Sequence, residues 1–514
     1  MQEKPEKWND ATKREFIGSA FENGYCKKKC SLLVLIAMIC IIILTISASG
    51  WNDVGWHNDF MPTPNLNTLA REGVILDNMY SQPICTPSRV ALMTGKYPAK
   101  VGMQHFVVLP MRPYYLPGNY ATLAEKLKEQ GYTNHIVGKW HLGSCDWKYT
   151  PMWRGFDSHY GCHEGVTSNF ETHMLTWPPV VGVSGRDLRD NTGLVTHENG
   201  THNTMLFSER AERIVKNHNP ESPLFLYVPY MAPHFPLQAP QGFEEAVQLD
   251  DTDRRTFAGM MAAMDQGVGN ITQALKDKGM WDDTLFVFLS DNGGDKMFAG
   301  SNYPYRGNKA TMWEGGVKVP AFIRGSMLKT SGTVNNELYH FTDIFATLLK
   351  VAGGTPDEDI DGKNQWDSFC KGKPSKRSEI LLHLDEHPVT NGAALRMGDY
   401  KYMEGVTINV PMLLPRNDIE HFDQWFTPAE NPDASTPDVP PITENVNNRY
   451  LFNIKDDPLE TNNLYNDPAK QEIINEMKQR LDEFRTSVPP FWFPGEDESG
   501  NPDNFGGAWS PGWC

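Results

Sequence analysis

Three runs of apolar residues dominate the hydrophobic pattern of the chain. Two of them, residues 224–229 and 284–289, are short and rich in branched and aromatic side chains. Short, continuous apolar runs are typical of strands that a parallel sheet buries on both faces. We therefore predict central strands at these two positions.

Helix-like segments alternate with these strands. Residues 254–278 carry apolar side chains on one stripe at helical spacing, and residues 122–130 and 203–216 predict further helices. We interpret the methionines of the stripe as core residues and not as a cofactor site. The alternation predicts a doubly wound α/β domain, in which ligands bind beyond the carboxyl ends of the strands.

The pattern changes near residue 375. Shorter apolar segments with intervening turns favour a second, smaller α+β domain over residues 376–514, after a larger α/β domain over residues 50–375. Its predicted elements are short antiparallel strands at residues 380–383, 393–396 and 401–403, a polar loop at 428–447 and a helix at 473–484.

The third apolar run, residues 31–48, carries no charged residue and is about long enough to span a bilayer. Lysines at positions 27–29 precede it and should stay cytoplasmic. The pattern predicts a cytoplasmic segment at residues 1–30, a signal-anchor at 31–49 and a lumenal chain from Gly50 onward. A buried core strand is the alternative, although strands rarely run so long.

Charge and cysteine content narrow the choice of partners. The chain has 514 residues and a formal net charge of −17, so it repels nucleic acid and acidic membrane surfaces. An anionic ligand would therefore require a local basic pocket. Asn199 and Asn270 stand in glycosylation sequons, which fit a lumenal chain. Four cysteines allow disulfides whose pairing the sequence leaves open: Cys145, Cys162, Cys370 and Cys514.

The segment C-T-P-S-R at residues 85–89 predicts a nucleophile. Cys85 lies four residues before Arg89, on the same helical face. Pro87 is tolerated only in the first turn of a helix, which places Cys85 at or just before the helix N-terminus. Backbone N–H groups and the helix dipole favour an anion there. A buried free cysteine is the alternative interpretation.

Polar residues at the ends of predicted strands are further candidates. Asp291 and Asn292 follow one strand and offer hard oxygen ligands for Ca²⁺ or Mg²⁺, although D-N-G-G is often only a turn. Lys139 and His141 lie two residues apart, so in extended chain they would point into one pocket. His234, between prolines, is a candidate acid–base or anion-binding group, whereas a lone histidine is more often structural.

The C-T-P-S-R segment and the following T-G-K-Y block resemble the signature of the type I sulfatases. The resemblance covers residues 50–514 and implies the alkaline-phosphatase-like sulfatase fold. In that family the cysteine becomes formylglycine. One hydroxyl of its hydrated aldehyde attacks sulfur, and the other then expels sulfate.

The resemblance also implies roles for individual residues. Lys139, in K-W-H-L-G, would contact the sulfate and the formylglycine, while His141 would steady the attacking hydroxyl. Lys309, between R-G-N-K and W-E-G-G, would be the second sulfate-binding lysine. Together with Arg89 these lysines would meet the anionic sulfate. The implied ligands of a Ca²⁺ ion, with Mg²⁺ less expected, are Asp291, Asn292 and the modified Cys85.

One departure from the family pattern concerns the metal. Sulfatases carry an Asp-Asp pair after their first strand, and Ser47 and Ala48 hold those places here. The residues predicted as an anchor thus also occupy the place of the first core strand. Either the N-terminal part is an incorrect or alternative exon, which we favour because the other catalytic positions are retained, or the protein is a membrane-tethered, metal-poor relative.

Within the family the chain looks most similar to the arylsulfatase B group. This resemblance implies a sulfate ester on a galactosamine-containing glycosaminoglycan, or an aryl sulfate, as substrate. It also implies a formylglycine-generating enzyme as a partner and a lysosomal or extracellular destination. The alternatives are a membrane-tethered sulfated-glycan binder with little activity, and a phosphatase of the related fold. Such phosphatases use a Thr or Ser nucleophile and two metals held by many Asp and His residues, which we do not find.

Overall fold

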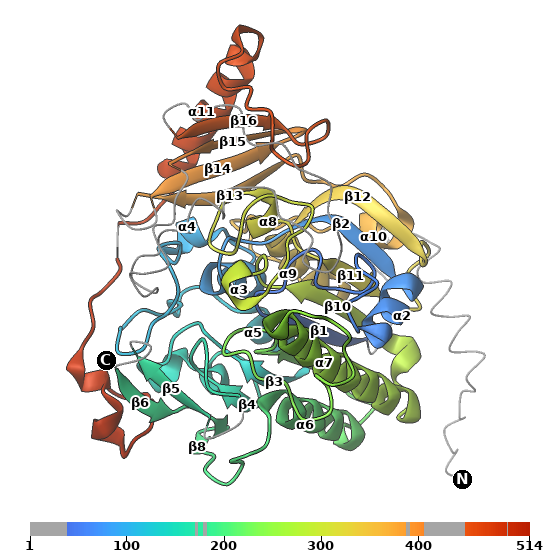
Figure 1. Ribbon diagram of the computed structural model, residues 1–514, viewed down its shortest axis with the longest axis vertical. Helices are drawn as coiled ribbons and strands as arrows, with labels where there is room; N and C mark the ends of the chain where they lie inside the picture. Colours follow the sequence, from blue (N-terminus) through green and yellow to red (C-terminus); the bar gives the residue numbers. More distant parts are fainter. Residues whose placement is uncertain (1–38, 170–172, 178–181, 387–390, 406–447, 491) are drawn as a thin grey trace, which may run out of the picture.

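A mixed sheet of ten strands forms the centre of the protein (Figure 1). The computed structural model describes residues 39–169, 173–177, 182–386, 391–405, 448–490 and 492–514. The strand order is β12-β2-β11-β10-β1-β9-β3-β4-β7-β8. The bounds are β1 (Cys40–Ile46), β2 (Val74–Tyr80), β3 (Thr133–Lys139), β4 (Ser158–Cys162), β7 (Arg189–Asp190), β8 (Gly193–Leu194), β9 (Leu224–Pro229), β10 (Thr284–Ser290), β11 (Ala321–Arg324) and β12 (Thr333–His340).

Strand β1 lies in the middle of this sheet. It pairs in parallel with β10 on one side and β9 on the other, so that Leu44 lies opposite both Phe288 and Val228. Ile41 and Ile43 belong to the core on one face of the sheet, and the alternate residues of β1 belong to the core on the other face. Both faces of β1 are therefore apolar, because neither meets water.

The prediction that residues 31–49 span a membrane is wrong from Cys40 onward, because residues 40–46 form this central strand. A strand buried on both faces has the same continuous apolar sequence as part of a membrane span, which explains the error. Residues 1–38, with the predicted cytoplasmic segment, lie outside the described residues. Within the described ranges, no helix is long and apolar enough to cross a membrane.

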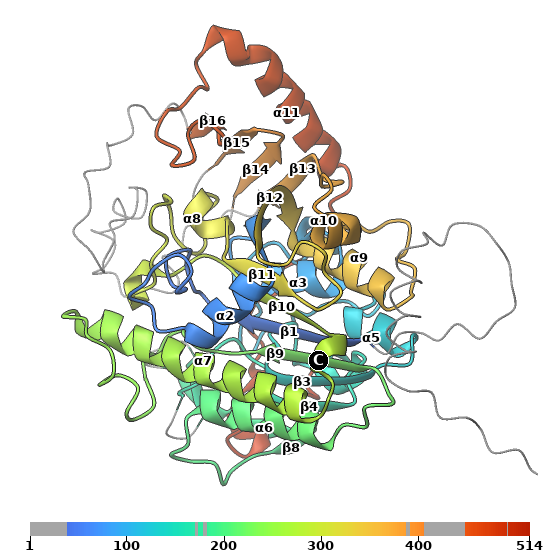
Figure 2. The same cartoon turned by 90° about the vertical axis from the view of Figure 1, so that its right-hand side faces the viewer.

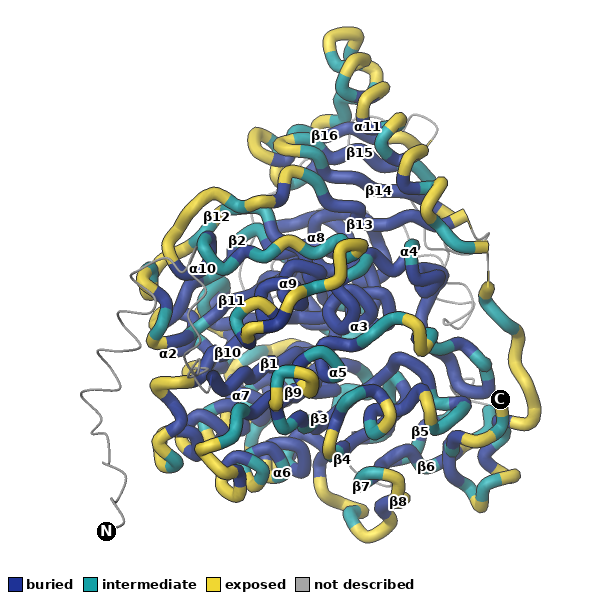
Figure 3. Tube along the Cα trace, turned by 180° about the vertical axis from the view of Figure 1, so that it is seen from behind, coloured by how far each residue is buried: buried dark blue, intermediate teal, exposed yellow. Residues whose placement is uncertain are grey.

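Helices cover both faces of the sheet (Figure 2). Helices α2 (Pro64–Glu72), α6 (Asn203–Asn217) and α7 (Thr252–Asp277) pack on one face. Helices α3 (Cys85–Thr94), α5 (Leu123–Lys128) and α9 (Phe341–Val351) pack on the other. The central strands β1, β9 and β10 are buried, while the outer helices are partly exposed (Figure 3). The predicted α/β fold, with strands at 224–229 and 284–289 and its three helices, is confirmed.

A smaller antiparallel sheet follows, as predicted. Its strands are β13 (Glu379–Asp385), β14 (Gly392–Met397), β15 (Tyr400–Glu404) and β16 (Arg449–Asn453), with helix α11 (Gln471–Arg485) against them. The predicted loop at 428–447 lies outside the described residues. The remaining elements are α4 (Pro98–Val101), β5 (Met174–Trp177), β6 (Val183–Arg186), α8 (Glu314–Val317) and α10 (Trp366–Lys371), with short 3-10 turns between.

One disulfide fastens the C-terminal tail to the larger sheet's loops. Cys145, six residues after β3, is bonded to Cys514, while Cys162 and Cys370 are buried free thiols. Trp509 is buried and donates from its indole nitrogen to the carbonyl of Leu175 in β5. The tail therefore packs on the body of the protein.

Candidate active site

The carboxyl ends of four neighbouring strands bring the candidate residues together. Strand β3 ends at Lys139, and β1, β10 and β9 lead directly into the segments that carry Ser47, Asp291 and His234. These strands are parallel, so their carboxyl ends share one edge of the sheet. The sequence predicted this edge as the ligand site.

Cys85 is the first residue of helix α3, where the sequence places it. The chain before it is extended at Ile84, and the helix ends at Gly95, whose φ of 68° is left-handed. The side chain of Cys85 is buried in a small apolar cluster with Ile84, Val107 and Ala310. The thiol is therefore shielded from bulk water and surrounded by these side chains.

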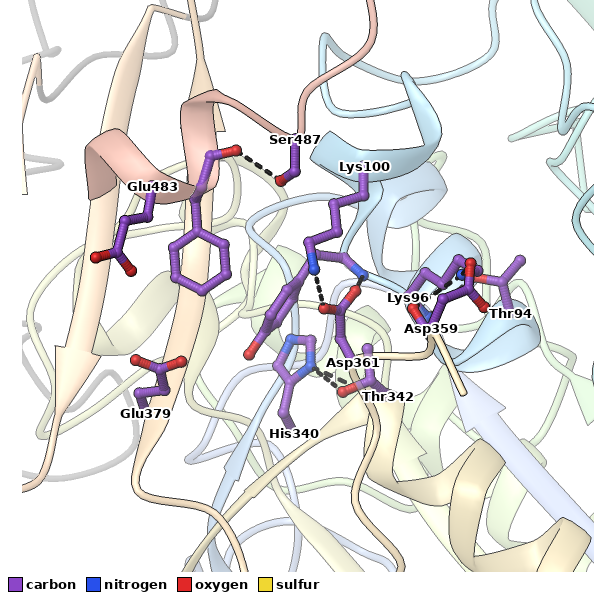
Figure 4. A network of polar contacts seen from close by, with 12 residues as sticks. Thr94, Lys96, Lys100, His340, Thr342, Asp359, Asp361, Glu379, Glu483 and Ser487 are labelled. Carbon is purple, nitrogen blue, oxygen red and sulfur yellow. Dashed lines mark hydrogen bonds and ion pairs between the residues drawn. The ribbon is translucent and has the colours of Figure 1, made fainter. Parts of the chain in front are cut away.

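The far end of helix α3 is fixed by a polar network (Figure 4). Asp361 accepts from Lys100 Nζ at 2.5 Å and from the backbone N–H of Tyr97 at 2.8 Å. Lys96 forms an ion pair with Asp359 in the same loop. These contacts hold the segment after α3 against the loop that follows α9, so the helix that presents Cys85 has a fixed position.

Arg89 lies one turn after Cys85 and joins three strand ends. Its Nη2 donates to Asp291 Oδ2 at 3.0 Å and to Ser47 Oγ at 3.2 Å, and its Nη1 donates to the Lys139 carbonyl at 2.9 Å. Burial is the largest single effect and tends to raise the pKa of Asp291. The charges of Arg89, Lys139 and Lys309 and the hydrogen bond from the Ala48 N–H together outweigh it, so the pKa lies below its usual value. Arg89 and Asp291 therefore form a buried ion pair beneath the nucleophile position.

Lys139 and His141 both lie in this cluster, but the sequence argument for them was wrong. The strand ends at Lys139, and His141 has a left-handed φ of 60°, so the two residues do not share an extended segment. Burial lowers the pKa of Lys139 to about 8. Burial and the charge of Lys139 hold the pKa of His141 well below its usual value, while its Nε2 lies 2.9 Å from the Val108 carbonyl.

His234 and Lys309 form the opposite wall. Lys309 Nζ donates to His234 Nε2 at 2.8 Å, so Nδ1 carries the ring proton and donates to the Phe235 carbonyl at 3.0 Å. Burial and Lys309 keep the pKa of His234 well below its usual value. Asp295 Oδ2 lies 3.9 Å from Lys309 Nζ. The sequence did not predict Asp295, because a turn residue after two glycines has no pattern that marks it as functional.

A narrow pocket lies beside this pair of residues. It is lined by Ala48, Pro233, His234, Phe235, Phe257, Asp295, Phe298 and Lys309.

The residues present do not fit a divalent cation. Both carboxylate oxygens of Asp291 already accept hydrogen bonds, because Oδ1 accepts from the Ala48 N–H at 3.0 Å and Oδ2 accepts from Arg89 and Ser47. Asn292 Oδ1 is buried and has no hydrogen-bond partner among the described residues. In the part of the chain that the structure describes, no three His, Cys, Asp or Glu residues could hold a metal together. One paired carboxylate and one amide are far from the oxygen cage that Ca²⁺ prefers.

Buried histidines make the stability of the fold sensitive to acid. Burial lowers the pKa of His159 to about 3, whereas an unfolded histidine titrates near 6.5. The folded form therefore loses stability as pH falls below 6.5. Glu164 has the opposite effect on stability. Burial raises its pKa to about 8, so its contribution to stability is complete below pH 4.5 and is lost as pH rises above that value. Among the described residues, histidines with a lowered pKa outnumber carboxylates with a raised pKa. We therefore expect the melting temperature to fall between pH 6.5 and pH 4.5.

His159→Phe tests this pH dependence because it keeps a ring stacked on His163 and removes one titration. We expect a shallower fall of melting temperature with acid than in the unchanged chain. His197→Gln, at an exposed position, is the control and should leave the slope unchanged. Equal slopes for both variants would contradict the assignment.

Comparison with solved structures defines the class of fold. The structure of Ps i-CgsB in complex with k-i-k-neocarrahexaose superposes with a TM-score of 0.72 at 27% identity, covering 91% of this chain and 97% of that one. The PsFucS1 sulfatase from Pseudoalteromonas sp. has a similar fold, with a TM-score of 0.68 at 23% identity over 95% and 96% of the two chains. The predicted alkaline-phosphatase-like α/β fold of sulfatases is confirmed.

The family model described as Sulfatase matches residues 40–354, and the chain belongs to the sulfatase family. Arylsulfatase J of Mus musculus is 37% identical over 490 residues, 92% of this chain and 80% of the relative. N-acetylgalactosamine-6-sulfatase of Homo sapiens is 32% identical over 352 residues, 65% of this chain and 66% of the relative. The chain is thus a sulfuric ester hydrolase by family, and its similarity to the arylsulfatase B group stays a prediction.

Proposed function

We propose that this chain hydrolyses sulfate esters on galactosamine-containing glycosaminoglycans, with formylglycine made from Cys85. The observation that carries the proposal is the position of Cys85 at the N-terminus of α3, on the same helix as Arg89, whose guanidinium reaches the Lys139 carbonyl. When present, formylglycine supplies a hydrated aldehyde as the nucleophile. The surrounding cations supply the field that an anionic sulfate needs.

The residues of the site divide the remaining tasks. Lys139 Nζ is buried and has no hydrogen-bond partner among the described residues, and its pKa of about 8 leaves it charged in neutral and acidic solution. It is therefore available to a sulfate oxygen. Lys309 binds a second sulfate oxygen, and His234 lies beside it as a neutral acid–base group near the ester oxygen. His141 steadies the attacking hydroxyl.

Other observations support the substrate class and compartment. One relative carries the name N-acetylgalactosamine-6-sulfatase, and the solved structure of Ps i-CgsB holds k-i-k-neocarrahexaose, so we favour sulfated glycans as substrates. The Cys145–Cys514 disulfide supports an oxidising compartment, lysosomal or extracellular. The formylglycine-generating enzyme would act on residue 85 during synthesis.

A second candidate function is sulfated-glycan binding with little turnover. It is favoured by Ser47 and Ala48, which carry no carboxylate, so that Asp291 is the one carboxylate among the described residues that forms an ion pair with Arg89. The cationic residues that hold sulfate are retained in either case. The two candidates differ in rate and not in ligand.

The experiment is to make the chain together with a formylglycine-generating enzyme and to measure the mass of the peptide containing residue 85. We expect the formylglycine mass, and hydrolysis of an aryl sulfate faster than of the matching aryl phosphate. An unmodified thiol in all molecules, or faster phosphate cleavage, would overturn the proposed function. Modification with sulfate binding but no turnover would favour the second candidate.

A further inference from the structure

We propose that Arg89 takes the place of a divalent cation in this site, so that the chain binds sulfate without Ca²⁺ or Mg²⁺. The inference rests on the proposed assignment of the site to sulfate. Its structural basis is the buried ion pair between Arg89 and Asp291, in which both side chains are 2% exposed. Asp291 is the carboxylate that a metal would require.

The guanidinium is held by more than this one ion pair. Arg89 Nη2 also contacts Ser47 Oγ, and Ser47 Oγ in turn lies 3.3 Å from Asp291 Oδ2 and 3.1 Å from the Tyr230 carbonyl. A metal ion at Asp291 Oδ2 would compete with Arg89 for the same oxygen, and displacing the guanidinium would leave it buried without its counter-charge. Removing one partner of a buried ion pair is strongly unfavourable.

The charges around the pocket already suit an anion. Arg89, Lys139 and Lys309 carry positive charge, and the described carboxylates that contact them are Asp291 and Asp295. The excess positive charge comes from the protein itself. A sulfate group therefore finds its counter-charge without an added ion.

Ala48 shows where an acidic ligand is lacking. Its φ is 57°, a left-handed conformation that is uncommon for alanine and several-fold enriched in Asp and Asn. Its N–H donates to Asp291, and Ala48 lines the pocket together with His234 and Lys309. The backbone at this position would accept an aspartate with less strain than an alanine. The position thus has the conformation of a ligand residue without the carboxylate.

The test is calorimetric titration of the full chain with CaCl₂ and, separately, with sodium sulfate in the presence or absence of EDTA. We expect no saturable Ca²⁺ binding and the same sulfate affinity with and without EDTA. In the double variant Ser47→Asp with Ala48→Asp we expect Ca²⁺ affinity to rise at least about tenfold, because carboxylate charge sets Ca²⁺ affinity. The matched Ser47→Asn with Ala48→Asn variant has the same shape without charge and should not bind Ca²⁺.

Stoichiometric Ca²⁺ binding by the unchanged chain, or a loss of sulfate affinity in EDTA, would overturn the inference. Those two measurements decide it even where the double variant does not fold. They also separate it from the proposed function, because neither depends on formylglycine or on turnover. A chain that never hydrolyses an ester but binds sulfate equally in EDTA would support the inference while the proposed function failed.

Discussion

Cys85→Ser is expected to abolish sulfate ester hydrolysis while leaving the fold intact. Serine is close to cysteine in size, so it fits the buried first turn of α3. Its single hydroxyl can accept a sulfate group, but no second hydroxyl remains to expel it. We therefore expect turnover to fall by at least about 10³-fold, as is usual when a nucleophile is lost. The measurement is kcat on an aryl sulfate, with intact mass showing one sulfate group at residue 85.

Cys370→Ser is the matched control. Cys370 is also a buried free thiol, but it lies in α10, where its Sγ contacts the Met327 carbonyl. The control should keep its activity. Full activity in Cys85→Ser, or equal losses in both variants, would show that Cys85 is a core residue and not the nucleophile.

Lys401→Met is expected to destabilise the protein and weaken substrate binding together. Lys401, on β15, is fully buried and forms ion pairs with Glu314 at 3.0 Å and Glu460 at 2.8 Å. Without Lys401, the carboxylates of Glu314 and Glu460 would be buried without their counter-charge. Removing one partner of a buried ion pair typically lowers stability by about 3–5 kcal/mol. We expect a loss of this size in the free energy of unfolding, measured with denaturant.

The effect on binding follows from the contacts of Glu460. It accepts from the N–H of Glu314, and its carbonyl accepts from Arg306, whose guanidinium stacks on Trp313 at 3.6 Å. Arg306 and Trp313 flank Lys309 in sequence. Loss of the Lys401 ion pairs should therefore loosen the segment that carries Lys309, and should raise KM more than it lowers kcat. Sulfate affinity should fall in the same variant.

The pH dependence of stability distinguishes loss of the Lys401 ion pairs from a general loss of packing. Burial raises the pKa of Glu460 to about 7, from the 4.5 of an unfolded glutamate. The contribution of Glu460 to the free energy of unfolding is therefore complete below pH 4.5 and is lost as pH rises toward 7. Lys401→Met should be most harmful at neutral pH, whereas Lys455→Met, exposed in the same part of the chain, should change stability by less than about 0.5 kcal/mol. Equal losses of stability in Lys401→Met at pH 7 and at pH 4.5 would contradict this role of Lys401.

The sequence predicted those features that depend on local periodicity. Helix α7 and strand β9 follow from the spacing of apolar residues, and the start of α3 at Cys85 follows from the chemistry of Pro87. The same method failed at β1, because a strand buried on both faces has no polar alternation to separate it from a membrane segment.

The features that sequence did not predict depend on distant residues. The Arg89–Asp291 pair joins residues 202 positions apart, and the disulfide joins residues separated by 369. The pairing of Lys139 with His141 was predicted from an extended backbone, but a left-handed residue, with His141 N–H bonded to the His163 carbonyl, determines the geometry. Such contacts are fixed only when the sheet forms.

The central position of β1 also has a consequence for how the protein is made. The ribosome synthesises this strand before all the other described strands, yet the Thr45–Tyr227 contact with β9 spans 182 residues and the Ser47–Asp291 contact beyond β10 spans 244. Pairings of this range form slowly. The nascent chain therefore carries its most apolar strand without its neighbours during much of translation, a state prone to aggregation. We therefore expect the yield of folded protein to depend on how long residues 40–46 stay unpaired before β9 and β10 emerge.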